Sequence, residues 1–206
     1  MTPPGYTVLR VADDFTIPLL HRHAERLGEG AFAALKHFVS FVVDPGVYRV
    51  TWDGRQLSTL RRPASRLREG MPTRRMVSPM ATQRGRFPKP APPSPYDGVR
   101  LEGVSTLLTN AAGDELYESC SATIVAWDGE ALVLPPEDAP AVASLAEAAI
   151  ASNELVRRHP LAADGTWPLL LVNAVAGTCA IDVPGRGVFP ADVRSRLTAL
   201  LVREDA

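Results

Sequence analysis

Two Asp-Gly pairs, each set between β-prone segments, place the strongest constraint on how this chain folds. Asp53-Gly54 separates V-Y-R-V-T-W from R-Q-L-S-T-L, and Asp128-Gly129 separates A-T-I-V-A-W from E-A-L-V-L-P. An Asp-Gly pair favours a tight turn with positive φ, so each pair predicts a β-hairpin. The sequence therefore predicts antiparallel strand pairing in both halves of the chain.

Further elements are predicted between and beyond the two hairpins. Apolar and β-branched runs favour strands at 6–11, 105–108, 122–127, 168–173 and 177–182. Apolar residues at three- to four-residue spacing, or alanine-rich composition, favour helices at 17–39, 139–158 and 190–202. Helices and strands mixed in this order predict an α+β fold.

Residues 61–95 differ in composition from the rest of the chain. Eight arginines fall between Arg61 and Arg86 beside a single acid, Glu69, and prolines accumulate from Pro88 onward. This composition is typical of a linker or a long irregular connection. We therefore predict a smaller N-terminal α/β lobe at 1–85 that includes this connection, and a C-terminal α/β lobe at 86–206.

The composition indicates the cellular compartment that we expect for this protein and argues against some classes of binding partner. Apolar residues make up 46% of the chain and charged residues 22%, which is typical of a globular protein. A net charge of −1 and the absence of aromatic residues between Arg55 and Arg86 argue against nucleic-acid binding. No apolar run approaches the ~20 residues of a membrane span. Cys120 and Cys179 form no C-x-x-C pair, so we expect reduced, buried thiols and a cytoplasmic protein.

Lysine is rare in this chain: of its 22 basic residues only Lys36 and Lys89 are lysines, and the others are arginines. A desolvated lysine amine loses its proton and forms a Schiff base with an aldehyde, which a guanidinium cannot do. Lys36 follows Ala-Ala-Leu in a predicted helix and is expected to extend to solvent. His21 and His23 do not share a helix face, so we expect no metal site there. Lys89 is the lysine with a candidate function.

Three segments, taken in order, resemble the class IV aminotransferase family, the fold-type IV pyridoxal-phosphate (PLP) enzymes. The first is H-R-H-A-E-R-L-G-E-G-A, similar to a family helix whose arginine holds the cofactor phosphate; Arg26 matches it. The second is L-L-T-N-A-A-G-D-E-L-Y-E-S-C-S-A-T-I, where Glu118 matches the glutamate that bonds the pyridine nitrogen. The third is N-A-V-A-G-T-C-A-I-D, where Thr178 matches a threonine near the phosphate. Lys89 lies 29 positions before Glu118, a separation similar to that in the family.

The resemblance implies a two-lobed fold-type IV architecture, shortened at its N-terminus, and PLP as the cofactor. It further implies transamination or elimination on an amino-acid-like or chorismate-derived amine, and a homodimer. The arginines at 61–86 favour a small anionic substrate, such as a dicarboxylate, that enters between the lobes. In this reading Lys89 is the Schiff-base lysine and proton shuttle, and Glu118 is the partner of the ring nitrogen. Arg26 and Thr178 are the phosphate ligands, with Ser144 at the start of a phosphate-binding helix.

One family motif is substituted, which leaves an alternative open. The family has a G-I-T or G-V-T triplet at the helix that cups the phosphate, whereas the nearest match here is Ser144-Leu145-Ala146. Glu137 and Asp138 are expected near the start of that helix, where they would repel a phosphate. Tyr96 stands at a different offset from the lysine than in the family. The alternative is a family member that has lost PLP and serves a binding or other PLP-independent role.

Overall fold

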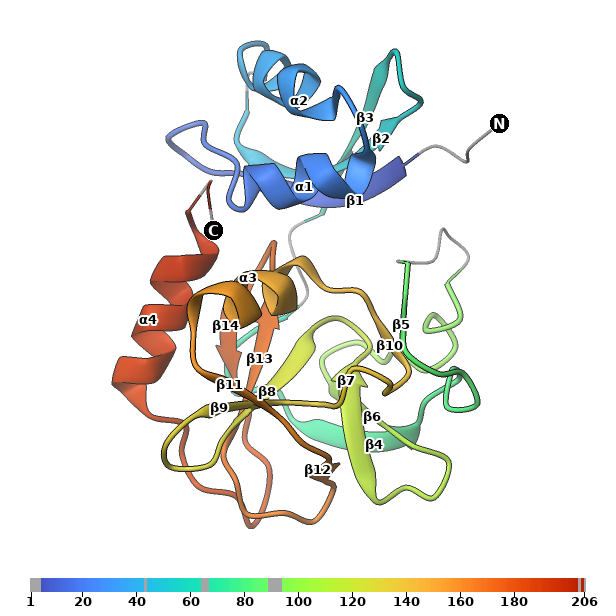
Figure 1. Cartoon of the computed structure of the whole chain (residues 1–206), viewed down its shortest axis with the longest axis vertical. Helices are drawn as coiled ribbons and strands as arrows, with labels where there is room; N and C mark the ends of the chain where they lie inside the picture. The colour runs from blue at the N-terminus through green and yellow to red at the C-terminus, as the bar shows by residue number, and fades with distance from the viewer. Residues whose placement is uncertain (1–4, 43, 64–66, 89–93, 204, 206) are drawn as a thin grey trace.

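The chain folds into two lobes of unequal size (Figure 1). The computed structural model describes residues 5–42, 44–63, 67–88, 94–203 and 205. The smaller lobe holds the N-terminal sheet and two helices, and the larger lobe holds the remaining sheets and helices. Lys89 lies outside the described residues, so its predicted role stays a prediction.

The smaller lobe is built on an antiparallel sheet of order β1-β2-β3. Its strands are β1 (Gly5–Val11), β2 (Gly46–Trp52) and β3 (Leu57–Arg62). One face of the sheet forms a hydrophobic core with the helices through Leu9, Val11, Tyr48, Val50 and Trp52. Side chains alternate between faces along a strand, so their neighbours in sequence point away from this core. The predicted hairpin is confirmed, and Gly54 in its turn has a φ of 93°.

The single helix predicted over 17–39 is wrong, because the structure divides it into two. These helices are α1 (Leu20–Leu27) and α2 (Ala31–Val39). Gly28 and Gly30 take φ values of 107° and 79°, which end the first helix and turn the chain before the second begins. Apolar spacing continues across the break because both helices cover the same sheet face.

Two sheets form the centre of the larger lobe, and a short parallel pair lies beside them. The order β12-β7-β6-β4 uses β12 (Leu161–Ala162), β7 (Glu115–Ser119), β6 (Ser105–Thr109) and β4 (Thr73–Val77). The order β11-β9-β8-β13-β14 uses β11 (Val156–Arg158), β9 (Leu132–Leu134), β8 (Thr123–Trp127), β13 (Leu169–Asn173) and β14 (Gly177–Ala180). The short pair is β5 (Arg86–Phe87) with β10 (Ala141–Val142). The second predicted hairpin is confirmed as β8–β9, with Gly129 at a φ of 106°.

Alternation along β13 explains how the larger lobe buries both faces of its longer sheet. Leu169 and Leu171 pack toward the neighbouring sheet, in a core with Leu107 and Leu116. Leu170 and Val172 point the other way, into a core with the helices α3 (Leu145–Asn153) and α4 (Ala191–Leu201). A strand that is buried on both faces reads as a continuous apolar run, as P-L-L-L-V-N does.

The arginine-rich stretch is more ordered than its composition predicts. Within it, β4 carries Arg74 and Arg75 and pairs in parallel with β6 of the larger lobe. The prediction of a wholly irregular connection is therefore wrong for 73–77. We propose that the lobe boundary lies between Arg62 and Thr73, earlier than the predicted position after residue 85.

The helix predicted over 139–158 is also shorter in the structure. Only Leu145–Asn153 is helical, preceded by β10 and followed by β11. Glu137 and Asp138 consequently precede the helix by several residues in the sequence, although Glu137 lies near its first turn through the shared partner Arg158. Among the described residues, no helix is long and apolar enough to cross a membrane.

Candidate active site

A pocket of about 660 Å³ takes its walls from both lobes. The smaller lobe contributes one face of its sheet and the end of α1. The larger lobe contributes the segment around Tyr96, the β7–β8 turn, the start of α3 and the β13–β14 turn. A cavity of this size between two lobes can enclose a small-molecule ligand.

Glu118 lies on the wall of this pocket and is 6% exposed. The pairing of β6 with β7 shifts register between Leu108 and Thr109, so that Tyr117 is an extra residue in β7. A bulge of this kind changes the face to which the following side chain points. Leu116 therefore enters the core between the sheets, whereas Glu118 turns to the side of Leu108 and the pocket.

Two donors hold the Glu118 carboxylate in place. The Tyr96 hydroxyl donates to Oε1 at 2.5 Å, and the Val142 amide donates to Oε2 at 3.1 Å. Burial raises the pKa of Glu118 to about 7, and the two hydrogen bonds and the charge of Arg86 oppose that rise. Burial and the neighbouring carboxylate raise the pKa of Tyr96 above its ordinary value, so the phenol stays protonated as a donor. No local pattern indicates this contact, because 22 positions separate Tyr96 from Glu118.

Arg26 and Ser144 meet at a second wall of the pocket, at the start of α3. The Arg26 guanidinium donates to the Ala143 carbonyl, the residue immediately before Ser144. Ser144 is the N-cap of α3, and its hydroxyl oxygen accepts the Glu147 amide at 3.2 Å. Burial lowers the pKa of Arg26 from its ordinary value, as expected for a cation largely withdrawn from water.

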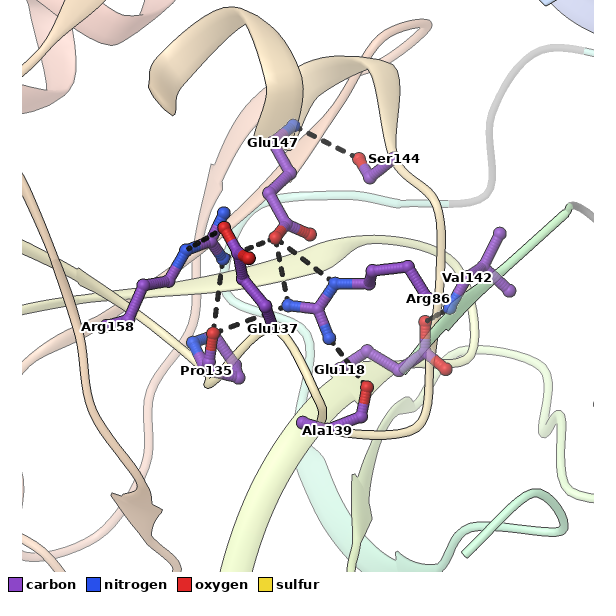
Figure 2. A network of polar contacts seen from close by, with 9 residues as sticks. All are labelled: Arg86, Glu118, Pro135, Glu137, Ala139, Val142, Ser144, Glu147 and Arg158. Carbon is purple, nitrogen blue, oxygen red and sulfur yellow. Dashed lines mark hydrogen bonds and ion pairs between the residues drawn. The ribbon is translucent and has the colours of Figure 1, made fainter. Parts of the chain in front are cut away.

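A buried ion-pair network fixes the start of α3 to β5 and β11 (Figure 2). A single oxygen of Glu147, Oε1, accepts from Arg86 Nη2 at 2.8 Å and from Arg158 Nη1 at 2.5 Å. Arg86 also donates to the Ala139 carbonyl at 2.8 Å. Glu137 lies on the outer side of this network, 3.9 Å from Arg158. The first acid in the helix is thus paired with two arginines and contributes little negative charge to the pocket.

The structure brings Arg26, Glu118 and Ser144 to one pocket but not Thr178. The Thr178 hydroxyl lies 2.6 Å from that of Thr198 on α4, and Thr178 is not among the residues that line the pocket. Thr178 therefore contacts a neighbouring helix outside the pocket lining, and its predicted role as a phosphate ligand stays a prediction.

Several pocket residues were not identified from the sequence. Tyr6, Arg49 and Arg100 line the same cavity as Glu118, and so does Arg62 of the arginine-rich stretch. Alternation in β1 and β2 could have placed Tyr6 and Arg49 on the face opposite the core. Nothing in the sequence indicates that this face meets the other lobe. Among the described residues, no group of three or more His, Cys, Asp or Glu side chains could hold a metal ion.

The sequence matches no protein-family model and no curated protein. Solved structures do match it over nearly its whole length. A hypothetical aminotransferase from Mycobacterium tuberculosis, in its PLP-bound form, is 16% identical with a TM-score of 0.63, and the match covers 98% of this chain and 90% of that one. The fold IV-transaminase from Curtobacterium pusillum is 16% identical with a TM-score of 0.60, covering 97% and 86%. The 4-amino-4-deoxychorismate lyase from Pseudomonas aeruginosa is 18% identical with a TM-score of 0.63, covering 96% and 89%.

The fold is that of the fold-type IV enzymes. The α+β, two-lobed architecture expected from the resemblance is therefore confirmed. At these identities the likeness establishes the fold-type IV architecture alone, and the chemistry has to be argued from the pocket.

Proposed function

We propose that the chain binds PLP in the pocket between its lobes and acts on an amino-acid-like or chorismate-derived amine. The reaction is a transamination or an elimination, since the sequence does not separate the two. One observation carries the proposal: a buried carboxylate, Glu118, lies in the same pocket as an arginine and a helix N-terminus, in a fold shared with PLP-bound structures. Two similar structures are described as PLP-bound and as bound to α-ketoglutarate and PMP.

Glu118 fits the requirements of a protonated ring nitrogen. An ionised carboxylate has about four lone-pair positions. Tyr96 and Val142 occupy one on each oxygen, so the carboxylate can accept a further hydrogen bond from a ring N–H. Burial strengthens an ionic contact of this kind. Glu118 would thereby keep the ring nitrogen protonated.

The wall at the start of α3 fits a phosphate. Arg26 supplies a cation, the Ser144 hydroxyl can still donate, and the start of α3 presents backbone amides. A helix N-terminus favours an anion because its dipole and its amides point toward it. Glu137 and Asp138, which were expected to repel a phosphate, are not among the residues that line the pocket. Glu137 lies beside Arg158, whose charge compensates its own.

We assign Lys89 as the amine that holds the cofactor. The assignment rests on the resemblance and on the positions of its neighbours in the sequence. Strand β5 ends at Phe87, whose carbonyl accepts the amide of Ala143 at 2.8 Å. Phe87 therefore lies beside the pocket wall, and two residues can span no more than about 7 Å. Ser94, on the other side of Lys89 in the sequence, lines the pocket. Lys89 lies between these two described segments in the sequence, and its role in the site is carried by the resemblance.

The roles proposed for Glu118, Arg26 and Ser144 are supported by their places in the pocket, and the role of Lys89 by the resemblance. When bound, PLP forms a covalent bond to an amine through its aldehyde carbon and accepts electrons from that amine into its ring. Lys89 would hold this aldehyde before substrate arrives and then move the proton at the substrate carbon. Glu118 would hold the proton on the ring nitrogen, and Arg26 with Ser144 would position the phosphate.

The visible absorption spectrum of the purified chain with added PLP tests this proposal. Free PLP is also yellow, so unbound cofactor is removed by gel filtration before the spectrum is recorded. We expect a visible band that stays with the parent protein and is lost in Lys89→Ala. Lys36→Ala is the matched control, because Lys36 is exposed and lies over the Phe32 ring. A parent that is colourless after gel filtration, or a band that survives in Lys89→Ala, would contradict the proposal.

The alternative is a protein that has kept the fold without PLP. The observation that favours it is the bond from Arg26 to the Ala143 carbonyl, which uses part of the donor capacity that a phosphate needs. A colourless parent would support this alternative. The proposal also includes a cytoplasmic homodimer, and light scattering of the purified chain tests the dimer.

A further inference from the structure

The Tyr96 side chain is fixed beside Glu118 by its own surroundings. Tyr96 is 4% exposed, and its ring packs in a hydrophobic cluster with Leu108. Its backbone belongs to a turn that is closed twice: the Asp97 amide donates to the Ser94 carbonyl, and the Ser94 amide donates to the Asp97 carboxylate, both at 2.9 Å. Because the oxygen of a tyrosine lies on the axis of its ring, a fixed ring also fixes the hydroxyl. That hydroxyl lies 2.5 Å from Oε1 of Glu118.

The hydrogen bond from Tyr96 has a large effect on the charge of Glu118. Burial opposes ionisation and raises the pKa of Glu118 to about 7, and the bond from Tyr96 is the largest of the effects that lower it. The bond from Val142 and the charge of Arg86 on β5 also lower this pKa, whereas the charge of Glu147 on α3 raises it. Arg86 and Glu147 form an ion pair at 2.8 Å, and their effects on Glu118 oppose each other (Figure 2). The Tyr96 hydroxyl therefore contributes strongly to a negative charge at this position.

A donor to the carboxylate also decides where a shared proton lies. A proton between Glu118 and a ring nitrogen lies on the more basic of the two atoms, and a hydrogen bond to a carboxylate lowers its basicity. The bond from Tyr96 therefore favours the proton on the ring nitrogen. Tyr96 keeps its own proton, because burial and the neighbouring Glu118 and Cys120 raise the pKa of its phenol above the ordinary value. It therefore remains a donor when Glu118 is ionised.

We propose that Tyr96 is a positioning residue that keeps Glu118 as a carboxylate and thereby holds the shared proton on the ring nitrogen of bound PLP. The part that concerns the ring rests on the proposed function, whereas the effect of Tyr96 on Glu118 does not require a ligand. Phenylalanine at this position would fill the same hydrophobic cluster and remove only the hydroxyl. The substitution Tyr96→Phe therefore separates the hydrogen bond from the packing of the ring.

The effect on Glu118 is measured on the full chain without PLP. ¹³C NMR of protein labelled at the glutamate carboxyl carbons follows each carboxyl group with pH, and the Glu118 signal is the one that Glu118→Gln lacks. We expect Glu118 of the parent to titrate near pH 7. Tyr96→Phe should raise this midpoint by about one pH unit or more, as for loss of a hydrogen bond to a charged group. Tyr117→Phe is the matched control and should leave the midpoint unchanged, because the Tyr117 hydroxyl bonds to Asn110 and Tyr117 does not line the pocket.

The effect on the ring is measured with PLP that is ¹⁵N-labelled at its ring nitrogen and bound to the protein. We expect the ¹⁵N NMR signal of a protonated ring in the parent and in Tyr117→Phe. In Tyr96→Phe the signal should move toward that of an unprotonated pyridine. If Tyr96 served packing alone, Tyr96→Phe would leave the ring signal where it is in the parent.

Three results would overturn the proposal: an unchanged Glu118 midpoint in Tyr96→Phe, an equal rise in Tyr117→Phe, or the parent ring signal in Tyr96→Phe. If Tyr96→Phe fails to fold, 3-fluorotyrosine at position 96 keeps the ring and the bond. Its phenol is more acidic and is a stronger donor, so the Glu118 midpoint should fall, and a midpoint that stays or rises contradicts the proposal. A parent that binds no PLP refutes the proposed function and the role toward the ring, whereas an unchanged Glu118 midpoint refutes the role of Tyr96 and leaves PLP binding intact.

Discussion

The Glu147 ion-pair network allows a stability prediction to be worked out from its geometry. Glu147 has a side-chain exposure of 7%, and its partners Arg86 and Arg158 have exposures of 18% and 28%. The substitution Glu147→Ala removes the carboxylate, which leaves Arg86 without its ion pair and Arg158 with only the exposed Glu137 at 3.9 Å. Loss of one member of a buried ion pair costs about 3–5 kcal/mol, because the remaining charge stays withdrawn from water.

Two features place the expected cost at the lower end of that range. Arg86 keeps the Ala139 carbonyl at 2.8 Å, and Arg158 keeps the Pro135 carbonyl at 3.1 Å. The partial exposure of Arg158 also lets water replace some of the lost interaction. We expect Glu147→Ala to lower the free energy of unfolding by about 3 kcal/mol, which corresponds to a fall in Tm of roughly 6–12 °C for a chain of this length.

Thermal unfolding followed by circular dichroism at pH 7 measures this effect. Glu130→Ala is the control, because Glu130 forms an ion pair with Arg157 on the same strand as Arg158 but is 76% exposed. Exposed ion pairs contribute little, so we expect no measurable change in Tm for the control. Equal Tm values for Glu147→Ala and Glu130→Ala would show that the network does not stabilise the fold.

Two further predictions concern the pocket. Because the pKa of Glu118 is raised to about 7, its contribution to stability is complete below about pH 4.5 and is lost as the pH rises through about 7. The urea midpoint of the parent should therefore fall between pH 5 and 8. This fall should be smaller in Glu118→Gln, which has no carboxyl group to titrate. An equally steep fall in the variant would contradict this assignment. Arg26→Gln should raise the dissociation constant of PLP, measured by absorbance titration, by about 10- to 100-fold through loss of a charged hydrogen bond. Arg22→Gln, one turn earlier on α1, should leave that constant unchanged.

Strands and hairpins could be predicted from local sequence because their signals are local. Both Asp-Gly turns, the buried run before Asn173 and the last helix are present in the structure. The helix break at Gly28 and Gly30 could not be predicted from apolar spacing, because both helices pack against the same sheet and preserve the period across the break. Glycine at these two positions was the available signal, since their φ values are positive.

The pocket was predicted less completely than the fold. Arg26, Glu118 and Ser144 were each selected by resemblance and lie together in the structure, whereas Thr178 was selected by the same means and does not. Contacts between the lobes depend on how the small-lobe sheet packs against the larger lobe, and no local sequence pattern encodes that packing. Arg49 was missed for this reason, since its outward position in the small-lobe sheet is visible from alternation but its neighbour across the pocket is not.

The environment of Glu118 bears on whether the pocket binds a cation. Its carboxyl group is buried and its pKa lies at about 7, so its ionisation costs free energy when the pocket holds no ligand. A glutamine would fill the same space without that cost. If the protein kept only the fold, a carboxyl group at this position would lower its stability without a benefit. A protonated ring nitrogen beside Glu118 would favour the carboxylate and recover the cost of its desolvation. The carboxyl group at this position therefore favours the PLP-binding reading over the alternative in which the cofactor has been lost.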